Sequence, residues 1–257
     1  MSPAISRYVV PVDYSRVEYL KTALALAAEL HKKLGCIGEI ILFVPHKGMV
    51  ERTTLADAIG TSVIKGLKKN RTVPLKRTCN MKLESMGTIK RNRNAEIIVG
   101  IYAHQKMLDE IDGLFNVKGV IVAPSKMDDL TQWIRTWNPE IVGQEPTPPE
   151  KLIENPVIEK ALKAITGHIN LSTGLTYPSD HDYAVGLLKC VHKHFGLEPP
   201  NSIRAWAIRN RWSPDAANKL AGIARSLLEH RRVHGGKNFR CTKQIIEWLR
   251  DRSENKT

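Results

Sequence analysis

Polar side chains follow several of the apolar runs in the first half of the chain, at positions where they could bind an anion. Hydroxyl, imidazole and ammonium groups beside the N–H donors of a helix N-terminus suit a phosphate or a carboxylate. In open α/β sheets, ligands bind outside the carboxyl ends of the strands. The candidate ligand-binding residues at this edge are Asp13, Ser15, His46, Lys47, Gly48, Tyr102, His104, Ser125 and Lys126.

Four of these residues would do the most chemistry with a phosphorylated ligand. Asp13 would accept a hydrogen bond or act as a base, and His104 would serve as an acid or base. Lys47 and Lys126 would bind the anion. The chain lacks G-x-G-x-x-G after its first apolar run and lacks G-x-x-x-x-G-K-[ST], so no cofactor is assigned. Caps and turns of a sheet that binds nothing explain the same residues, and the pattern leaves open whether the protein is an enzyme.

The start of the chain also resembles a known family. Residues 8–44 read Tyr-Val-Val-Pro-Val-Asp-Tyr-Ser, a helical stretch, and then Glu-Ile-Ile-Leu-Phe-Val, which is similar to the opening of a universal stress protein domain. The resemblance implies ATP binding at the strand ends. The family carries a glycine-rich phosphate loop after its fourth strand, whereas here Val99 and Gly100 run into Ile-Tyr-Ala-His. The family's binding residues are therefore not transferred to this chain.

Positive charge is the unusual feature of the composition, with a formal net charge of +13. It gathers in residues 65–93, opposed only by Glu84, and in residues 204–243, opposed only by Asp215 and Glu229. Such segments bind phosphate backbones without reading sequence, in a salt-sensitive way, although a merely solvated basic face looks the same. The candidate nucleic-acid-binding residues are Lys68, Lys69, Arg71, Arg91, Arg93, Arg225, Arg231, Arg232, Lys237, Arg240 and Lys243.

Two other arrangements invite a site but have a structural explanation. The predicted helices 202–210 and 213–230 suggest a helix-turn-helix, yet their turn lacks the usual glycine, and we favour a helical hairpin with Trp206 and Trp212 in the core. The polar stretch 168–182 mixes histidines, hydroxyls and acids, but its spacing does not place two ligands on one helix face, so no metal is assigned.

The elements expected to position these residues alternate in type along the first half of the chain. This order predicts an α/β fold, with a doubly wound, mainly parallel, Rossmann-like sheet of five or six strands. Residues 80–94 are polar and basic and are expected to form a loop or a short helix. Apolar runs predict strands at 7–12, 39–45, 72–79, 95–102, 117–123 and 140–143, and amphipathic spacing predicts helices ending near residue 34 and over 53–69, 104–114 and 127–137.

A proline-rich segment, residues 144–150, separates this first domain, residues 1–143, from a smaller all-helical domain, residues 151–257. Helical spacing and start signals there predict five helices. They cover about 155–166, 179–195, 201–210, 213–230 and 241–252.

The remaining composition bears on compartment and partners. The four cysteines form no C-x-x-C pair, so we expect reduced, mostly buried thiols rather than a disulfide scaffold. No apolar run is long enough for a membrane span and no signal peptide is recognised, so we expect a cytoplasmic protein with no membrane partner.

Three functions follow, with the oligomeric state left open. The favoured one is an accessory protein that contacts nucleic acid through both basic segments. The second is an enzyme or sensor with a phosphorylated ligand at the sheet edge. The third is an assembly subunit whose helical domain packs on a protein partner, anchored by some of the tryptophans Trp133, Trp137, Trp206, Trp212 and Trp248.

Overall fold

The chain consists of two compact units, Met1–Pro149 and Glu150–Thr257. The computed structural model describes residues 5–12, 17–69, 72–76, 79–92 and 95–251. Among the described residues, no helix combines the length and apolar character needed to cross a membrane.

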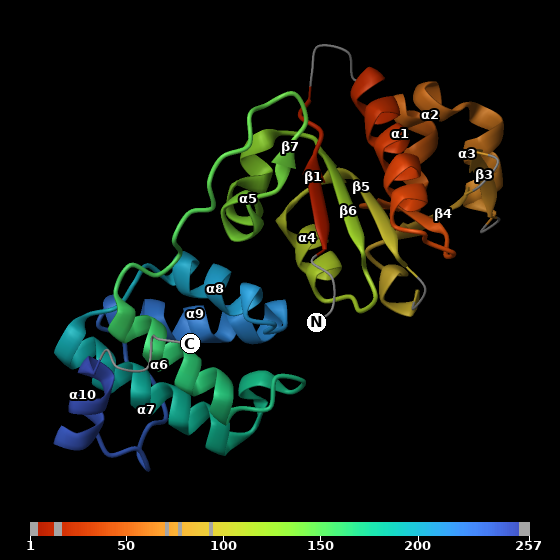
Figure 1. The fold of residues 1–257 in the computed structure, drawn as a ribbon. Coiled ribbons are helices and arrows are strands. Elements are labelled where there is room, and N and C mark those ends of the chain that lie inside the picture. Colours follow the sequence, from red (N-terminus) through yellow and green to blue (C-terminus); the bar gives the residue numbers. More distant parts are fainter. Residues whose placement is uncertain (1–4, 13–16, 70–71, 77–78, 93–94, 252–257) are drawn as a thin grey trace. The chain divides into compact units, whose positions relative to one another are not determined.

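The first unit is built on a seven-stranded sheet (Figure 1). Its strand order is β3-β4-β2-β5-β6-β1-β7, and every neighbouring pair is parallel except β3 with β4. The α/β class and the mainly parallel sheet are confirmed. The strands are β1 (Ser6–Val9), β2 (Ile40–Val44), β3 (Val73–Lys76), β4 (Cys79–Ser85), β5 (Ile97–Ala103), β6 (Gly119–Pro124) and β7 (Glu140–Ile141).

Strand order departs from the classical dinucleotide-binding arrangement, in which the first strand lies beside the second at the centre of the sheet. Here β1 lies between β6 and β7, and β2 pairs with β4 and β5. The first connection therefore passes over two strands. The pattern of strands and helices predicts the layers of such a sheet but not the order of its strands.

The segment 80–94, expected to be a loop or a short helix, contains most of β4, and a short 3-10 helix, η2 (Ile89–Arg91), follows it. Cys79, Met81 and Leu83 are buried on one face of this strand, while Asn80 is exposed and Lys82 half-buried on the other. The strand was missed because its outward residues are polar and charged, so that the segment has the composition of a loop.

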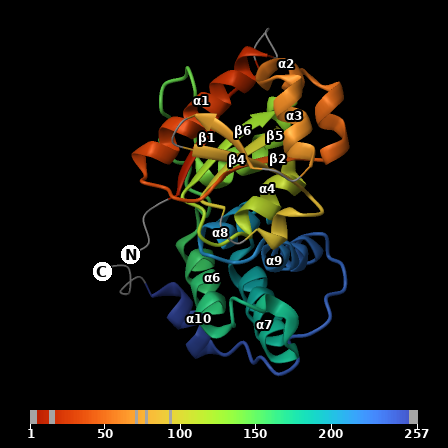
Figure 2. The same ribbon diagram turned by 90° about the vertical axis from the view of Figure 1, so that its right-hand side faces the viewer.

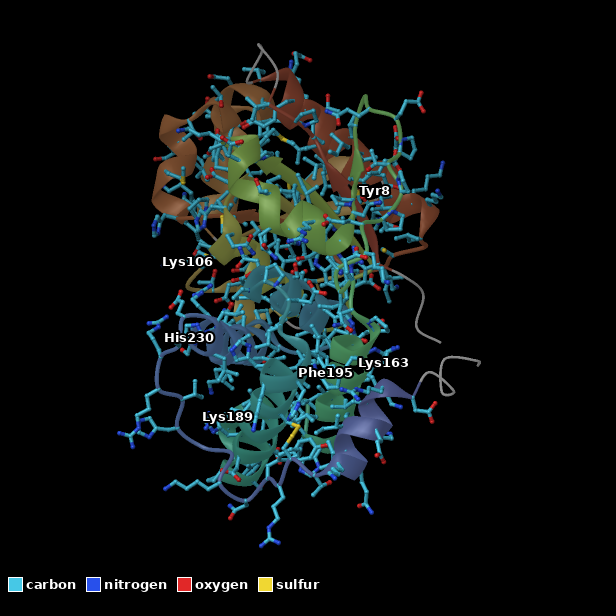
Figure 3. All side chains as sticks on the ribbon, turned by 90° about the vertical axis from the view of Figure 1, so that its left-hand side faces the viewer. Tyr8, Lys106, Lys163, Lys189, Phe195 and His230 are labelled. Atoms are coloured by element: carbon cyan, nitrogen blue, oxygen red, sulfur yellow. A yellow bond between two sulfur atoms is a disulfide. The ribbon has the colours of Figure 1, made fainter. Side chains whose placement is uncertain are left out.

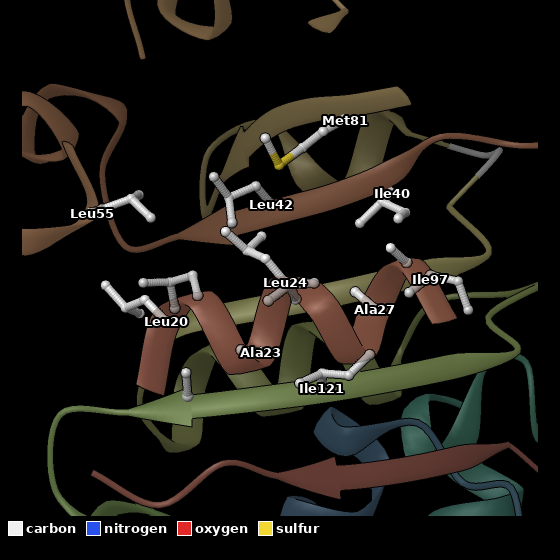
Figure 4. Close-up of a cluster of buried hydrophobic side chains, with 14 of the residues drawn as sticks. Leu20, Ala23, Leu24, Ala27, Ile40, Leu42, Leu55, Met81, Ile97 and Ile121 are labelled. Atoms are coloured by element: carbon white, nitrogen blue, oxygen red, sulfur yellow. The ribbon is translucent and has the colours of Figure 1, made fainter. Parts of the chain in front are cut away.

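Helices cover both faces of the sheet (Figure 1). On one face, α1 (Glu18–Lys33), α2 (Thr54–Ile59) and α3 (Thr61–Lys68) pack on a core in which Leu20, Leu24 and Ala27 meet strand residues such as Leu42 (Figure 4). On the other face, α4 (Gln105–Asp112) and α5 (Thr131–Trp137) cover a second core. Gly60, with φ +91°, divides the predicted helix 53–69 into α2 and α3.

The second unit is helical, as predicted. Its α-helices are α6 (Pro156–His168), α7 (Pro178–Phe195), α8 (Pro200–Arg209), α9 (Pro214–Leu228) and α10 (Lys243–Arg250). Helix α7 contacts α6 and α9, α8 packs on α9, and α10 lies on α6 (Figure 2). Side chains of Asn155, Ser213 and Thr242 cap α6, α9 and α10, which explains where these helices begin.

The cysteines correct one expectation. Cys36 and Cys79 are buried free thiols, as predicted. Cys190 and Cys241 instead form a disulfide, with a Cα–Cα distance of 5.6 Å. Because 51 positions separate the two residues, only the packing of the second unit reveals that they meet.

Candidate functional sites

The carboxyl edge of the sheet brings together three residues that the sequence singled out. His46, His104 and Lys126 follow β2, β5 and β6, which are neighbours in the sheet. Each has an extended backbone and precedes a helical turn: η1 (Lys47–Arg52), α4 and η3 (Met127–Leu130) respectively. None of the three side chains caps the helix that it precedes. The edge therefore combines backbone N–H donors with two imidazoles and one ammonium group.

Lys47 has a partner inside the protein. Its Nζ lies 3.6 Å from Oε2 of Glu84, and Nζ of Lys82 lies 3.4 Å from Oε1 of the same carboxylate. The Glu84 side chain is only 7% exposed. Burial alone would raise the pKa of Glu84, but the hydrogen bond with Thr88 and the charges of Lys47 and Lys82 together lower it below its ordinary value. Glu84 was missed because β4 was not predicted.

Tyr102 has a structural role at the same edge. It adopts φ +54°, where the register of β5 against β6 shifts between Ile101 and Ala103. Its hydroxyl lies 2.9 Å from the Thr54 hydroxyl, which links the strand to α2. Gly48 and Ser125 are exposed, and Asp13 and Ser15 lie outside the described residues.

The first basic segment is partly neutralised. Lys68 pairs with Glu51 at 2.8 Å, and Lys90 pairs with Glu110 at 3.1 Å. Lys69 and Arg91 are exposed. Arg71 and Arg93 fall outside the described residues. Because acids from other elements approach these lysines, the segment offers less positive charge than its sequence suggests.

The second basic segment runs from α8 through α9 and a connecting loop to the first residue of α10. Residues 230–242, here called the basic loop, connect α9 to α10. Arg231 forms an ion pair with Glu229. The candidate cations here are all exposed: Arg225 on α9, Arg231, Arg232, Lys237 and Arg240 in the loop, and Lys243 at the start of α10.

Asp182 on α7 holds the middle of the basic loop. Its carboxylate accepts hydrogen bonds from the backbone N–H groups of Gly236, Lys237 and Asn238 at 2.6, 3.1 and 3.0 Å. These bonds, the one from Asn238 first, lower the pKa of Asp182 below its ordinary value. The carboxylate is therefore ionised at neutral pH, when it accepts all three bonds.

Three further positions of α7 hold the loop. Lys189 Nζ donates to the carbonyls of Val233 and Gly235 at 3.0 and 2.7 Å, and Cys190 binds Cys241 covalently. Gly186 leaves room for the Phe239 side chain. Figure 3 shows Lys189 on α7, His230 at the start of the loop and the sulfur–sulfur bond.

One face of α7 carries all the anchoring positions, because residue 186 lies four positions after residue 182, and residues 189 and 190 lie three and four positions after residue 186. Sequence reasoning did not identify this face as the anchor. The signal available in the sequence was the occurrence of Asp, Gly and Cys at intervals of four residues along α7, opposite a later Gly-Gly and Cys.

The helical hairpin of α8 and α9 belongs to the core. Trp206 and Trp212 are 6% and 2% exposed, which confirms that both are core residues, and Trp212 Nε1 donates to the Thr166 hydroxyl at 2.9 Å. Arg204 is buried and its Nε donates to Asn218 Oδ1 at 2.6 Å. The hairpin therefore leaves little of α8 for contact with bases.

Two further features carry no ligand assignment. Within the described residues, no three His, Cys, Asp or Glu side chains could together hold a metal ion. A groove of about 470 Å³ lies between α6 and α10. Its lysines have internal partners, since Lys160 donates to the carbonyls of Trp248 and Asp251, and Lys163 pairs with Glu159.

Comparison with known proteins gave one match. The family model described as a domain of unknown function (DUF1889) matches residues 154–250, which run from just before α6 to the end of α10. No curated protein and no solved structure matches the chain.

Proposed function

We propose that the helical unit binds the phosphate backbone of nucleic acid through the basic loop, as an accessory protein rather than a catalyst and without reading base sequence. The observation that carries the proposal is that a loop rich in exposed arginine and lysine is fixed to α7 at residues 233–238 and at Cys241. A preordered loop loses less conformational entropy on binding than a flexible one.

The charge and exposure of the residues on and beside the loop support contact with the phosphate backbone of nucleic acid. Six exposed cations lie on the loop and its two flanking helices, and only Arg231 among them forms an ion pair with a described acid, Glu229. Lys69 and Arg91 of the first unit are proposed as auxiliary contacts. Each phosphate neutralised releases counterions, which makes binding weaken as salt rises.

Titration of a labelled duplex and a labelled single strand across a salt series tests the proposal. We expect dissociation constants of roughly 1–100 µM, with log K falling against log salt at a slope of about −5 for duplex, since each of the six cations contributes about −0.9. The double variants Arg231→Ala/Arg232→Ala and Lys237→Ala/Arg240→Ala should each make the slope shallower by nearly 2, because each removes two phosphate contacts.

Lys32→Ala/Lys33→Ala is the matched control. It removes the same charge from two exposed positions of α1, outside both basic segments. The proposal fails if this pair weakens binding as much as the loop pairs do, or if wild-type affinity does not change with salt.

A second candidate function is the binding of a phosphorylated small molecule at the sheet edge. The observation that favours it is the placement of His46, His104 and Lys126 before helical turns on three neighbouring strands. A bound ligand raises the melting temperature, with about 2.7 kcal/mol of stabilisation at 100 times Kd. In a panel of nucleotides and sugar phosphates, a stabilising compound should lose its effect in His104→Ala and Lys126→Ala but keep it in Lys106→Ala, which alters an exposed lysine of α4. A panel with no stabilising member contradicts this candidate.

The third function, an assembly subunit that packs on a protein partner, is supported by one exposed tryptophan among the five candidates. Trp133, Trp206 and Trp212 are buried and Trp137 is half-buried, whereas Trp248 is 37% exposed. Trp248 also has Lys160 Nζ 4.6 Å from its ring. We rank this function third.

The cytoplasm stays the proposed compartment. The disulfide favours an oxidising compartment instead, because such bonds are rare in the reducing cytosol. Trapping the thiols of freshly lysed cells with an alkylating reagent would measure how much of Cys190 is oxidised where the protein resides.

A further inference from the structure

We propose that the Cys190–Cys241 disulfide is a redox switch that sets the affinity of the basic loop for nucleic acid; this inference rests on the function proposed above. The disulfide joins two very different positions. Cys190 is 2% exposed within α7, whereas Cys241 is an exposed residue at the end of the loop. Breaking the bond therefore changes the loop and α10 more than it changes the core.

The anchors of the loop are unevenly distributed. Asp182 and Lys189 hold residues 233–238 through hydrogen bonds. Beyond Phe239, the covalent bond at Cys241 is the contact that holds the end of the loop to α7. The far end of α10 is held separately, since Lys160 of α6 donates to the carbonyls of Trp248 and Asp251, and the Arg250 guanidinium lies 5.4 Å from the Phe195 ring centroid. Helix α10 contributes little burial of its own, since Leu249 is its one buried residue in the described structure. The end of the loop thus depends on the disulfide more than its middle does.

The cations next to Cys241 belong to this dependent part. Arg240 precedes it and Lys243 follows it by two residues. Opening the disulfide loosens Arg240 and the first turn of α10, where Lys243 lies, whereas Arg225, Arg231 and Arg232 remain on or near α9. We therefore expect reduction to remove about two of the six phosphate contacts.

The chemistry is thiol–disulfide exchange with a dithiol. Its thiolate attacks Sγ of the exposed Cys241, the bond to Cys190 breaks, and the Cys190 sulfur leaves as a thiolate that takes up a proton. The second thiol of the reagent then displaces Cys241, and the dithiol ends as a cyclic disulfide. Two electrons and two protons pass to the protein. The Cys190 thiol can stay buried, because a free cysteine packs as a small apolar residue.

Tryptic cleavage and the binding of a labelled duplex distinguish the oxidised from the reduced form of the full chain. The loop and the first residue of α10 supply cleavage sites, after Arg240 and Lys243 among others. With dithiothreitol, we expect faster cleavage at these two sites, roughly tenfold weaker duplex binding at ~50 mM salt, and a salt slope shallower by nearly 2. The variant Cys190→Ala/Cys241→Ala should match the reduced protein with or without dithiothreitol, although it keeps Cys36 and Cys79.

The outcomes separate the switch from the proposed function. If the oxidised protein binds duplex, and reduction changes neither cleavage nor affinity, the switch is overturned while the proposed function stands. A response to dithiothreitol that persists in the double variant also overturns it, since the other thiols would then be responsible. If neither redox state binds the duplex, the proposed function is overturned, and the effect of the disulfide on affinity falls with it, whatever the cleavage pattern shows.

Discussion

Replacing Gly186 by alanine is expected to lower the free energy of unfolding by about 1–3 kcal/mol and to displace the basic loop from α7. A Cβ at this position would lie 2.1 Å from the Cβ and 2.5 Å from the Cγ of Phe239. The backbone of Gly236 also packs against Gly186, since a Cβ on Gly236 would lie 2.9 Å from the Gly186 Cα. Neither neighbour can turn away as a long flexible side chain would, so the loop backbone has to move.

The sign of this effect is opposite to the usual one. In a helix interior, Gly→Ala ordinarily stabilises by about 1 kcal/mol, because alanine loses less backbone entropy on folding. Gly222→Ala in α9 is the matched control, since a Cβ there meets nothing within 4 Å. Urea unfolding should show Gly222→Ala more stable than the wild type and Gly186→Ala less stable, with faster tryptic cleavage of the loop only in Gly186→Ala. Equal stabilisation by both substitutions would mean that the loop does not pack on this face of α7.

Residue patterns predicted the layers of the first unit well, because its central strands are buried on both faces. The runs at 39–45, 95–102 and 117–123 are nearly continuous in apolar residues and became β2, β5 and β6. Strand β4 was missed because Asn80, Lys82 and Glu84 alternate with its apolar residues, and the partner of Lys47 was missed with it. From the sequence alone, Lys47 looks available to bind an anion, although Glu84 on β4 already pairs with it.

The anchoring of the basic loop was out of reach for a different reason. Asp182 and Gly236 are 54 positions apart, and Cys190 and Cys241 are 51 apart. Local spacing identifies the face of a helix, but it does not say which distant loop will pack there. The basic character of residues 230–243 was plain from the sequence, whereas their fixed arrangement follows only from the packing of α7 against the loop.

The strongest pH effect is expected in the first unit, at Asp112, the last residue of α4. Burial raises the pKa of its carboxyl group to about 6, although the indole N–H groups of Trp137 and Trp133, at 3.0 and 3.4 Å, and the charge of Arg7 favour the ionised form. The Arg7 guanidinium lies 3.5 Å from the Trp137 ring centroid, and burial lowers its pKa to about 10. The protein therefore holds a poorly solvated charge here at neutral pH.

The sign of the pH dependence follows from proton binding. Between the ordinary aspartate pKa of 3.8 and about 6, the native state binds more protons at Asp112 than the unfolded state does. Its contribution to stability is therefore fully present at low pH and is lost as pH rises toward 6. The total is at most about 3 kcal/mol, since each pKa unit is worth about 1.4 kcal/mol. Other groups titrate over this range, so the informative quantity is the difference between the wild type and a variant.

Asp112→Asn should remove this term, because its neutral side chain resembles the protonated acid and keeps an oxygen for the indoles. Relative to the wild type, we expect its free energy of unfolding to rise by about 2.5 kcal/mol between pH 4 and pH 7.5, because a small part of the effect is already lost at pH 4. Asp129→Asn makes the same chemical change at an exposed position of η3 and should show no such trend. Urea unfolding at several pH values, followed by tryptophan fluorescence, measures both variants. A constant difference between Asp112→Asn and the wild type would mean that Asp112 titrates near its ordinary pKa, and that burial beside Trp133 and Trp137 costs the carboxylate little.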